Sequence, residues 1–107
     1  MPIAAWFIFI AAAILEVGGD AVVRKGLHEH QFLFIALGFI MLGFYGIVVN
    51  MVKWDFSRLL GTYVAVFAVV SILFGAVVYG EAIPLSRYVG LALIVAGGLV
   101  IQFGKGF

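Results

Sequence analysis

The 107-residue chain is 66% hydrophobic, only 10% of its residues are charged, and its formal net charge is +1. Soluble domains normally carry about 25% charged residues and about half apolar ones, so this composition excludes an ordinary water-soluble domain. The small net charge, without a basic cluster, gives no support to nucleic-acid binding. The chain has no cysteine for disulfides or thiolate metal sites. We expect neither a cofactor nor a metal site.

Four apolar segments follow one another along the chain. The first is interrupted only by Glu16 and Asp20, and the other three contain no charged residue apart from Arg87 at the start of the last. A transmembrane helix needs about 20 apolar residues, whereas a soluble helical bundle needs polar helix faces, which these segments lack. The expected fold class is therefore an all-α membrane protein, with one four-helix transmembrane domain over residues 1–107. Its helices are predicted at about residues 3–23, 32–52, 59–79 and 87–104.

The first segment lacks the features of a cleaved secretory signal. No Lys or Arg precedes it, and no small-residue cleavage site follows it. We therefore expect the first helix to be retained in a multi-pass protein of the cell inner (plasma) membrane.

The Lys and Arg residues outside the helices are divided equally between the two expected sides of the membrane. Lys53, Arg58 and Lys105 fall on the side of the N-terminus, and Arg24, Lys25 and Arg87 fall on the other. The positive-inside rule depends on the difference between the two counts, which is zero here. Two interpretations stay open. Another feature fixes one orientation, or the chain inserts both ways and pairs with its own inverted copy.

The first segment carries a short ladder of charged residues. At 3.6 residues per turn, Glu16, Asp20 and Arg24 lie on nearly the same helix face, and Glu16 is the deepest in the membrane. A charge near the bilayer centre costs about 2.5–3.5 kcal/mol on insertion scales, and a carboxyl avoids part of that cost by staying protonated. Such a group can release its proton when a cation arrives, so Glu16 and Asp20 are candidate proton and substrate sites.

Structural roles for the same acids stay open. Glu16 can instead be a neutral group that holds a neighbouring helix by a hydrogen bond, and Asp20 can pair with Arg24 four residues on. Gly18 and Gly19 beside the ladder would let another helix, or a ligand, approach closely.

Two further groups are candidates for binding and assembly. Tyr63 and Phe67 are four residues apart in the third segment, and aromatic faces attract organic cations; core packing or lipid contact is the alternative. In the fourth segment, Gly90, Gly97 and Gly98 form a small-residue pattern that is typical of close helix–helix contact in membranes. They predict a dimer contact, or else a helix that is merely rich in glycine.

Several motifs resemble a known group of proteins. GEAIPLSRYVGLALIVAGGLVI (residues 80–101) resembles the end of the four-helix unit of the drug/metabolite transporter superfamily, and LEVGGDAVVRKGL (residues 15–27) resembles the first helix of its small multidrug resistance branch. SRLLGTYVAVF (residues 57–67) is somewhat closer to the YnfA-type relatives. The chain departs from the branch where Tyr63 to Phe67 replace a Trp and a Gly-x-Gly hinge, and where Asp20 replaces a small or hydroxyl residue.

The resemblance implies a function. In that branch the membrane Glu, here Glu16, is the proton and cation site, the last-helix glycines, here Gly90 and Gly97, form the dimer contact, and the dimer is antiparallel. We therefore expect a small secondary transporter, not an enzyme, that acts by proton-coupled antiport (efflux) of a small organic cation as an antiparallel homodimer in the lipid bilayer. Two alternatives are a non-transporting membrane scaffold or accessory subunit, and a flippase for a lipid-linked metabolite. An acid-rich site argues against the anionic headgroup that such a lipid would carry.

Overall fold

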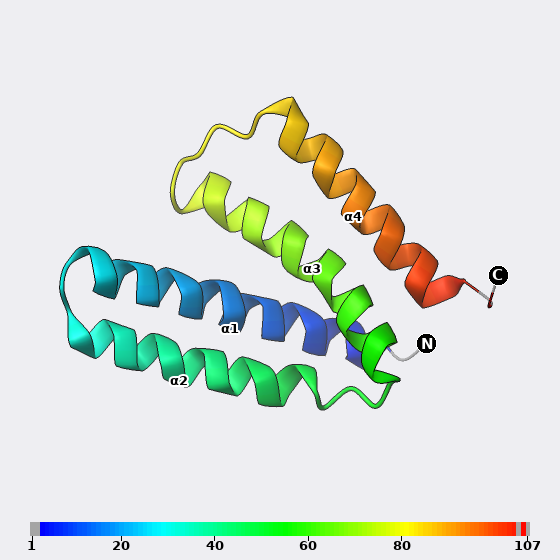
Figure 1. The fold of residues 1–107 in the computed structure, drawn as a ribbon, viewed down its shortest axis with the longest axis horizontal. Helices are drawn as coiled ribbons and strands as arrows, with labels where there is room; N and C mark the ends of the chain where they lie inside the picture. Colours follow the sequence, from blue (N-terminus) through cyan, green and yellow to red (C-terminus); the bar gives the residue numbers. More distant parts are fainter. Residues whose placement is uncertain (1–2, 105, 107) are drawn as a thin grey trace. The chain divides into compact units, whose positions relative to one another are not determined.

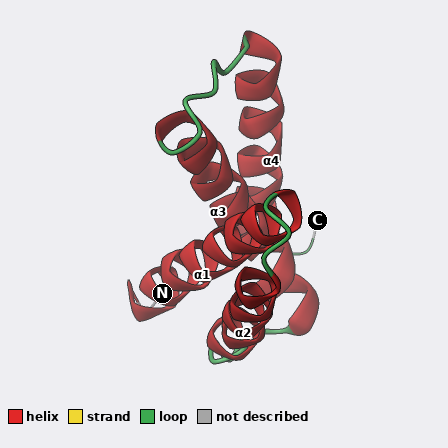
Figure 2. Cartoon of the chain, turned by 90° about the vertical axis from the view of Figure 1, so that its left-hand side faces the viewer, coloured by secondary structure: helices red, strands yellow, loops and turns green. Residues whose placement is uncertain are grey.

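A computed structural model describes residues 3–104 and residue 106 of the chain. Lys105, one of the basic residues counted above, lies outside this part. Every regular element within it is an α-helix, and the described residues contain no strand (Figure 1, Figure 2). The helices are α1 (Ile3–His28), α2 (Phe32–Val49), α3 (Phe56–Val77) and α4 (Leu85–Phe103). Each of these four described helices is long and apolar enough to cross a membrane, which confirms the predicted fold class.

Large apolar side chains cover the outer surfaces of these helices. Phe32 and Val77 are each 80% exposed, and Leu85 is 76% exposed. Soluble monomers rarely expose large continuous apolar patches. Such a surface is expected to contact the hydrocarbon chains of a lipid bilayer.

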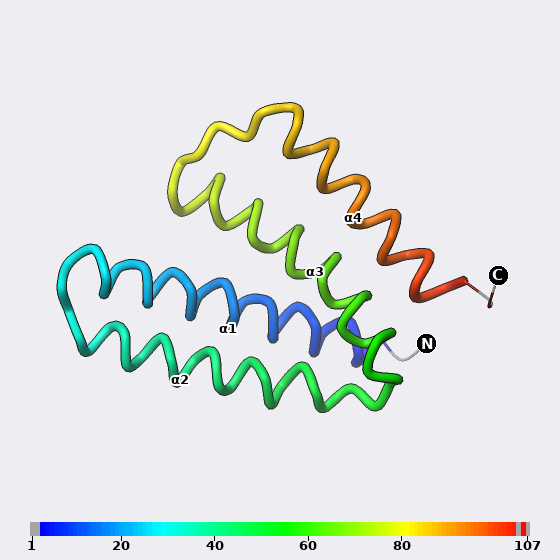
Figure 3. Tube along the Cα trace, in the orientation of Figure 1, coloured from blue at the N-terminus to red at the C-terminus, as the bar shows by residue number. Residues whose placement is uncertain are grey.

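The helices associate in pairs, α1 with α2 and α3 with α4. The first pair belongs to a compact unit that ends at Val52, and the second pair belongs to a unit that begins at Lys53. We call them the first hairpin (α1 and α2) and the second hairpin (α3 and α4). In each hairpin the two helices are antiparallel and are joined by a short connection (Figure 3). That all four helices form one domain stays a prediction.

In the first hairpin, α1 continues five residues beyond its predicted end, through residues 24–28. The basic residues Lys25 and His28 lie in its last turn, where positive charge interacts favourably with the negative end of the helix dipole. The chain then reverses within three residues. The backbone N–H of Gln31 donates to the carbonyl oxygen of Gly26 at 2.8 Å. α2 ends at Val49, three residues before its predicted end.

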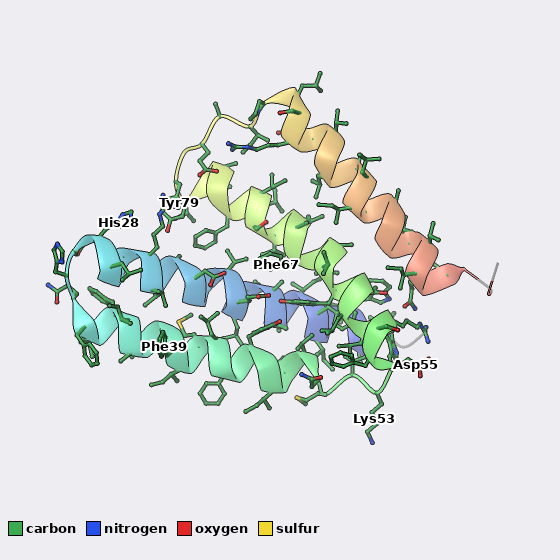
Figure 4. All side chains as sticks on the ribbon, viewed as in Figure 1. His28, Phe39, Lys53, Asp55, Phe67 and Tyr79 are labelled. Atoms are coloured by element: carbon green, nitrogen blue, oxygen red, sulfur yellow. The ribbon has the colours of Figure 1, made fainter. Side chains whose placement is uncertain are left out.

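In the second hairpin, α3 begins three residues before its predicted start, and α4 begins at Leu85, directly after Pro84. Pro84 stands directly before α4, and because proline has no backbone N–H, a helix cannot continue unbroken through this position. Glu81 lies in the connection, and its carboxylate Oε1 is 3.7 Å from Nη1 of Arg87. Figure 4 shows Tyr79 at the α3 end of this connection.

Candidate functional site

The helices of the first hairpin meet along one stripe on each helix. Three glycines mark the closest approaches. They pair Gly26 with Ile35, Val23 with Gly38, and Gly19 with Leu42. Each step of three or four residues along α1 is matched by an equal step back along α2, as two antiparallel helices in one register require. We call this line of contact the α1–α2 seam.

The same register extends the α1–α2 seam toward the N-terminal end of α1. By this spacing, Glu16 falls opposite Tyr45 and Ala12 falls opposite Val49. Ala12 and Val49 are buried, whereas Glu16 and Tyr45 are half-buried. The alternating steps of three and four are the heptad spacing by which helices interdigitate. The Glu16–Tyr45 layer is therefore a polar layer within an otherwise apolar seam.

Tyr45 was not among the residues singled out from the sequence. In the structure, its hydroxyl lies where the carboxylates of both Glu16 and Asp20 act on it electrostatically. Gly38, Leu42 and Tyr45 are spaced by four and then three residues, so they lie along one face of α2. That spacing was the available signal, but nothing in the sequence showed that this face of α2 meets α1.

The glycines beside the acids allow close helix contact, as predicted. A Cβ on buried Gly19 would lie 3.0 Å from the side chain of Leu42, and one on Gly18 would lie 3.2 Å from Cε of Met41. The approaching element at Gly18 and Gly19 is α2.

Asp20 lies beside the α1–α2 seam and is exposed, and Arg24, one turn further on, is also exposed. Asp20 is therefore more exposed than half-buried Glu16. An ion pair between Asp20 and Arg24 stays a prediction.

Tyr63 and Phe67 belong to the second hairpin (Figure 4 labels Phe67 on α3). Their ring centroids are 6.4 Å apart and the ring planes are inclined by 38°. Tyr63 is only 3% exposed, which agrees with the core-packing alternative for this residue. A ligand-binding role for Tyr63 and Phe67 stays a prediction.

A polar cluster at the start of α3 and the end of α4 was also missed from the sequence. The Nε–H of Arg58 donates to Oε1 of Gln102 at 3.1 Å, and the hydroxyl of Thr62 donates to the same oxygen at 3.4 Å. The Arg58 guanidinium also lies over the Trp54 ring, 4.6 Å from its centroid. Gln102 and Thr62 are buried. We call Trp54, Arg58, Thr62 and Gln102 the arginine cluster.

The three glycines of α4 differ in their surroundings. A Cβ on Gly98 would lie 2.6 Å from the Cβ of Ala65 on α3, so Gly98 serves the contact between α3 and α4. Positions 90 and 97 are open, with no atom within 4 Å of a Cβ built there. A dimer contact through Gly90 and Gly97 stays a prediction, and Gly98 already has a partner in its own chain.

Two other polar residues, Ser71 and Asn50, bond to backbone carbonyl groups close to them in the chain. The hydroxyl of Ser71 donates to the carbonyl oxygen of Ala68, in its own helix, at 2.9 Å. Asn50 donates to the carbonyl oxygen of Gly46 at 2.7 Å, at the end of α2. Among the residues that the structure describes, no three His, Asp or Glu side chains gather as metal ligands.

Comparison with known proteins places these features in a family. Residues 3–106 match the family described as "Uncharacterised BCR, YnfA/UPF0060 family". The chain belongs to the YnfA/UPF0060 family. This confirms the YnfA-type resemblance of the sequence.

Relatives of this family cover the chain almost completely, and each is named a UPF0060 membrane protein. One from Rhodococcus erythropolis is 33% identical over 100 residues, which are 92% of this chain and 93% of the relative. One from Kineococcus radiotolerans is 39% identical over 101 residues, which are 92% of this chain and 85% of the relative. One from Saccharopolyspora erythraea is 36% identical over 98 residues, which are 90% of this chain and 89% of the relative. No solved structure matches the chain. The chain is therefore a membrane protein of the YnfA/UPF0060 family.

Proposed function

We propose that this YnfA/UPF0060 protein is a small secondary transporter that exchanges protons for a small organic cation. The observation that carries the proposal is the position of Glu16, half-buried in the apolar α1–α2 seam. Ionisable groups within membrane helices are costly, and where they occur they commonly mark ion pathways and proton relays. A single carboxyl that binds either a proton or a cation couples the two fluxes, because one ligand displaces the other.

The groups around Glu16 suit a cationic substrate. Exposed Asp20 supplies a second carboxyl one turn away, and Tyr45 supplies a hydroxyl from α2. In the second hairpin, the aromatic pair of Tyr63 and Phe67 has ring faces of the kind that attract organic cations, and Tyr63 is only 3% exposed within its own hairpin. We assign no catalytic residue and no cofactor, because exchange by competition needs no covalent step.

We further propose that the working unit is an antiparallel homodimer in the cell inner membrane, related to the small multidrug resistance branch. Many transporters are built from two inverted repeats around a central site, and two inverted copies of one short chain reproduce that arrangement. The equal division of Lys and Arg between the two sides supports insertion in both orientations. The open Gly90 and Gly97 positions on α4 leave room for the helix of a second copy.

A membrane scaffold or accessory subunit is the second candidate, and one observation favours it. Glu16 lies in the α1–α2 seam itself, where a neutral carboxyl bonded to α2 would stabilise helix packing. Transport requires that Glu16 can ionise, whereas packing requires only a group that forms a hydrogen bond. A substitution that removes the ionisable carboxyl therefore distinguishes the two roles.

The test is substrate-induced proton release from purified protein in detergent, screened over guanidinium and quaternary ammonium compounds. Glu16→Gln keeps the side-chain shape but cannot ionise. We expect it to abolish proton release while the protein remains helical. Asp20→Asn is the matched control, and we expect a milder loss because Asp20 lies outside the seam.

Two outcomes contradict the proposal. Proton release that survives in Glu16→Gln places the coupling at another residue, with Asp20 next in line. A wild-type protein that releases no proton with any compound, together with a loss of stability in Glu16→Gln, supports the scaffold.

A further inference from the structure

The Glu16–Tyr45 layer interrupts a seam whose other layers are apolar or glycine. Gly19 and Leu42 lie on one side of it, and Ala12 and Val49 lie on the other. Close contact at Gly19 holds the two helix backbones together only one turn from Glu16. By the same register, Glu16 on α1 and Tyr45 on α2 fall at one level beside this contact, and both are half-buried. Register and close approach together bring the carboxyl and the phenol to the same level.

We propose that Tyr45 is the positioning residue of Glu16, and that its hydroxyl donates a hydrogen bond to the Glu16 carboxyl group. The inference deepens the proposed transport function and rests on it for its meaning, although the hydrogen bond itself can be measured without transport. In this role Tyr45 acts through the Glu16 carboxyl, which it orients.

A phenol is chemically suited to this position because it both donates and accepts. When Glu16 is ionised, the Tyr45 hydroxyl donates to a carboxylate oxygen, and such charge-assisted bonds are roughly twice as strong as neutral ones. When Glu16 is protonated, its carbonyl oxygen still accepts from the phenol, and the phenol oxygen can accept in turn. Both states of the acid are therefore satisfied inside the apolar seam.

Other charged groups of the first hairpin lie near this pair, and the experiment must separate them. Asp20 acts on the same hydroxyl, and Arg24 follows Asp20 on α1. Asp20 is exposed and lies beside the α1–α2 seam. Glu16, directly opposite Tyr45, is therefore the partner that the register selects.

The experiment is pH-difference infrared spectroscopy on the purified full-length protein. The carbonyl band of Glu16 is the one that Glu16→Gln removes and Asp20→Asn leaves in place. In Tyr45→Phe, which keeps the ring and loses only the hydroxyl, we expect this band to shift to higher wavenumber, because a hydrogen bond to the carbonyl oxygen is lost. Tyr88→Phe is the matched control, since Tyr88 is exposed on α4 in the other hairpin, and should leave the band unmoved.

A reciprocal measurement covers the case in which Tyr45→Phe does not fold. With isotope-labelled tyrosine, the phenol C–O band that belongs to Tyr45 should shift in Glu16→Gln and stay in place in Asp20→Asn. An unmoved Glu16 carbonyl band in folded Tyr45→Phe overturns the inference. So does a spectrum in which Glu16→Gln removes no carbonyl band, or a phenol band that responds to Asp20→Asn alone. These bands report on the pair whether or not the protein moves a cation, so a failure of the transport proposal would be seen separately, in the proton-release assay.

Discussion

The two hairpins are both antiparallel helix pairs, but they place their polar groups differently. The first hairpin holds one acid–phenol layer in the middle of its seam, at Glu16 and Tyr45. The second hairpin holds its buried polar groups near one end, where Arg58 and Thr62 both donate to Gln102. A polar group near a helix end lies close to the polar interface, whereas one in mid-helix is surrounded by hydrocarbon.

The difference indicates a division of roles. The arginine cluster of the second hairpin has an acceptor and donors in contact, as expected for a group that ties two helix ends together. The Glu16–Tyr45 layer carries an ionisable group where a purely structural seam would be more stable with an apolar residue. This contrast agrees with our proposal, in which the first hairpin's layer carries the chemistry and the second hairpin's cluster adds stability.

The largest structural effect is expected from Gly38 in the first hairpin. A Cβ at this position would meet the side chain of Val23 and would lie 2.9 Å from the carbonyl oxygen of Gly19, which cannot move without the backbone of α1. We expect Gly38→Ala to lower stability by about 1–3 kcal/mol, the usual cost of overpacking. SDS titration of helicity in detergent measures it. Gly43→Ala is the matched control on α2, because a Cβ there has no atom within 4 Å. Equal losses in both variants would show that the α1–α2 seam is not the close contact described here.

A smaller effect is expected in the second hairpin, where two adjacent glycines of α4 should behave differently. Gly98→Leu forces a side chain against the Cβ of Ala65, which has no rotamer to change, so the SDS midpoint should fall. Gly97→Leu projects into open space and should leave that midpoint unchanged. If Gly97 forms the dimer contact, the same variant should lower the dimer population in sedimentation equilibrium. A dimer population that does not respond to Gly97→Leu would remove this surface as the contact.

The smallest effect is expected from the arginine cluster. Gln102→Leu removes the oxygen that accepts from Arg58 and Thr62. Hydrogen bonds between membrane helices contribute about 0.6 kcal/mol on average and at most about 1.7 kcal/mol, so a loss in this range is expected in the same titration. Ser71→Ala should be neutral, because its hydroxyl bonds only the backbone of its own helix. A stabilised Gln102→Leu protein would show that the cluster serves something other than hairpin stability.

The sequence alone was sufficient for the number of helices, the membrane class and the identity of Glu16 as the unusual acid. Helix insertion depends on the apolar content of each segment and on the cost of each charge, which are local properties. The helix ends were less predictable. α1 ran on through residues 24–28 because a basic, proline-free segment can remain helical outside the hydrocarbon.

Only the tertiary structure decided which helix faces meet. A membrane helix such as α2 is apolar on all sides, so its sequence has no amphipathic pattern to show the buried face. Contacts in lipid are selected instead by close packing of small residues and by hydrogen bonds, which join positions far apart in the chain. For that reason Tyr45 opposite Glu16, Gly98 against Ala65 and Gln102 beside Arg58 became visible only when the helices were paired.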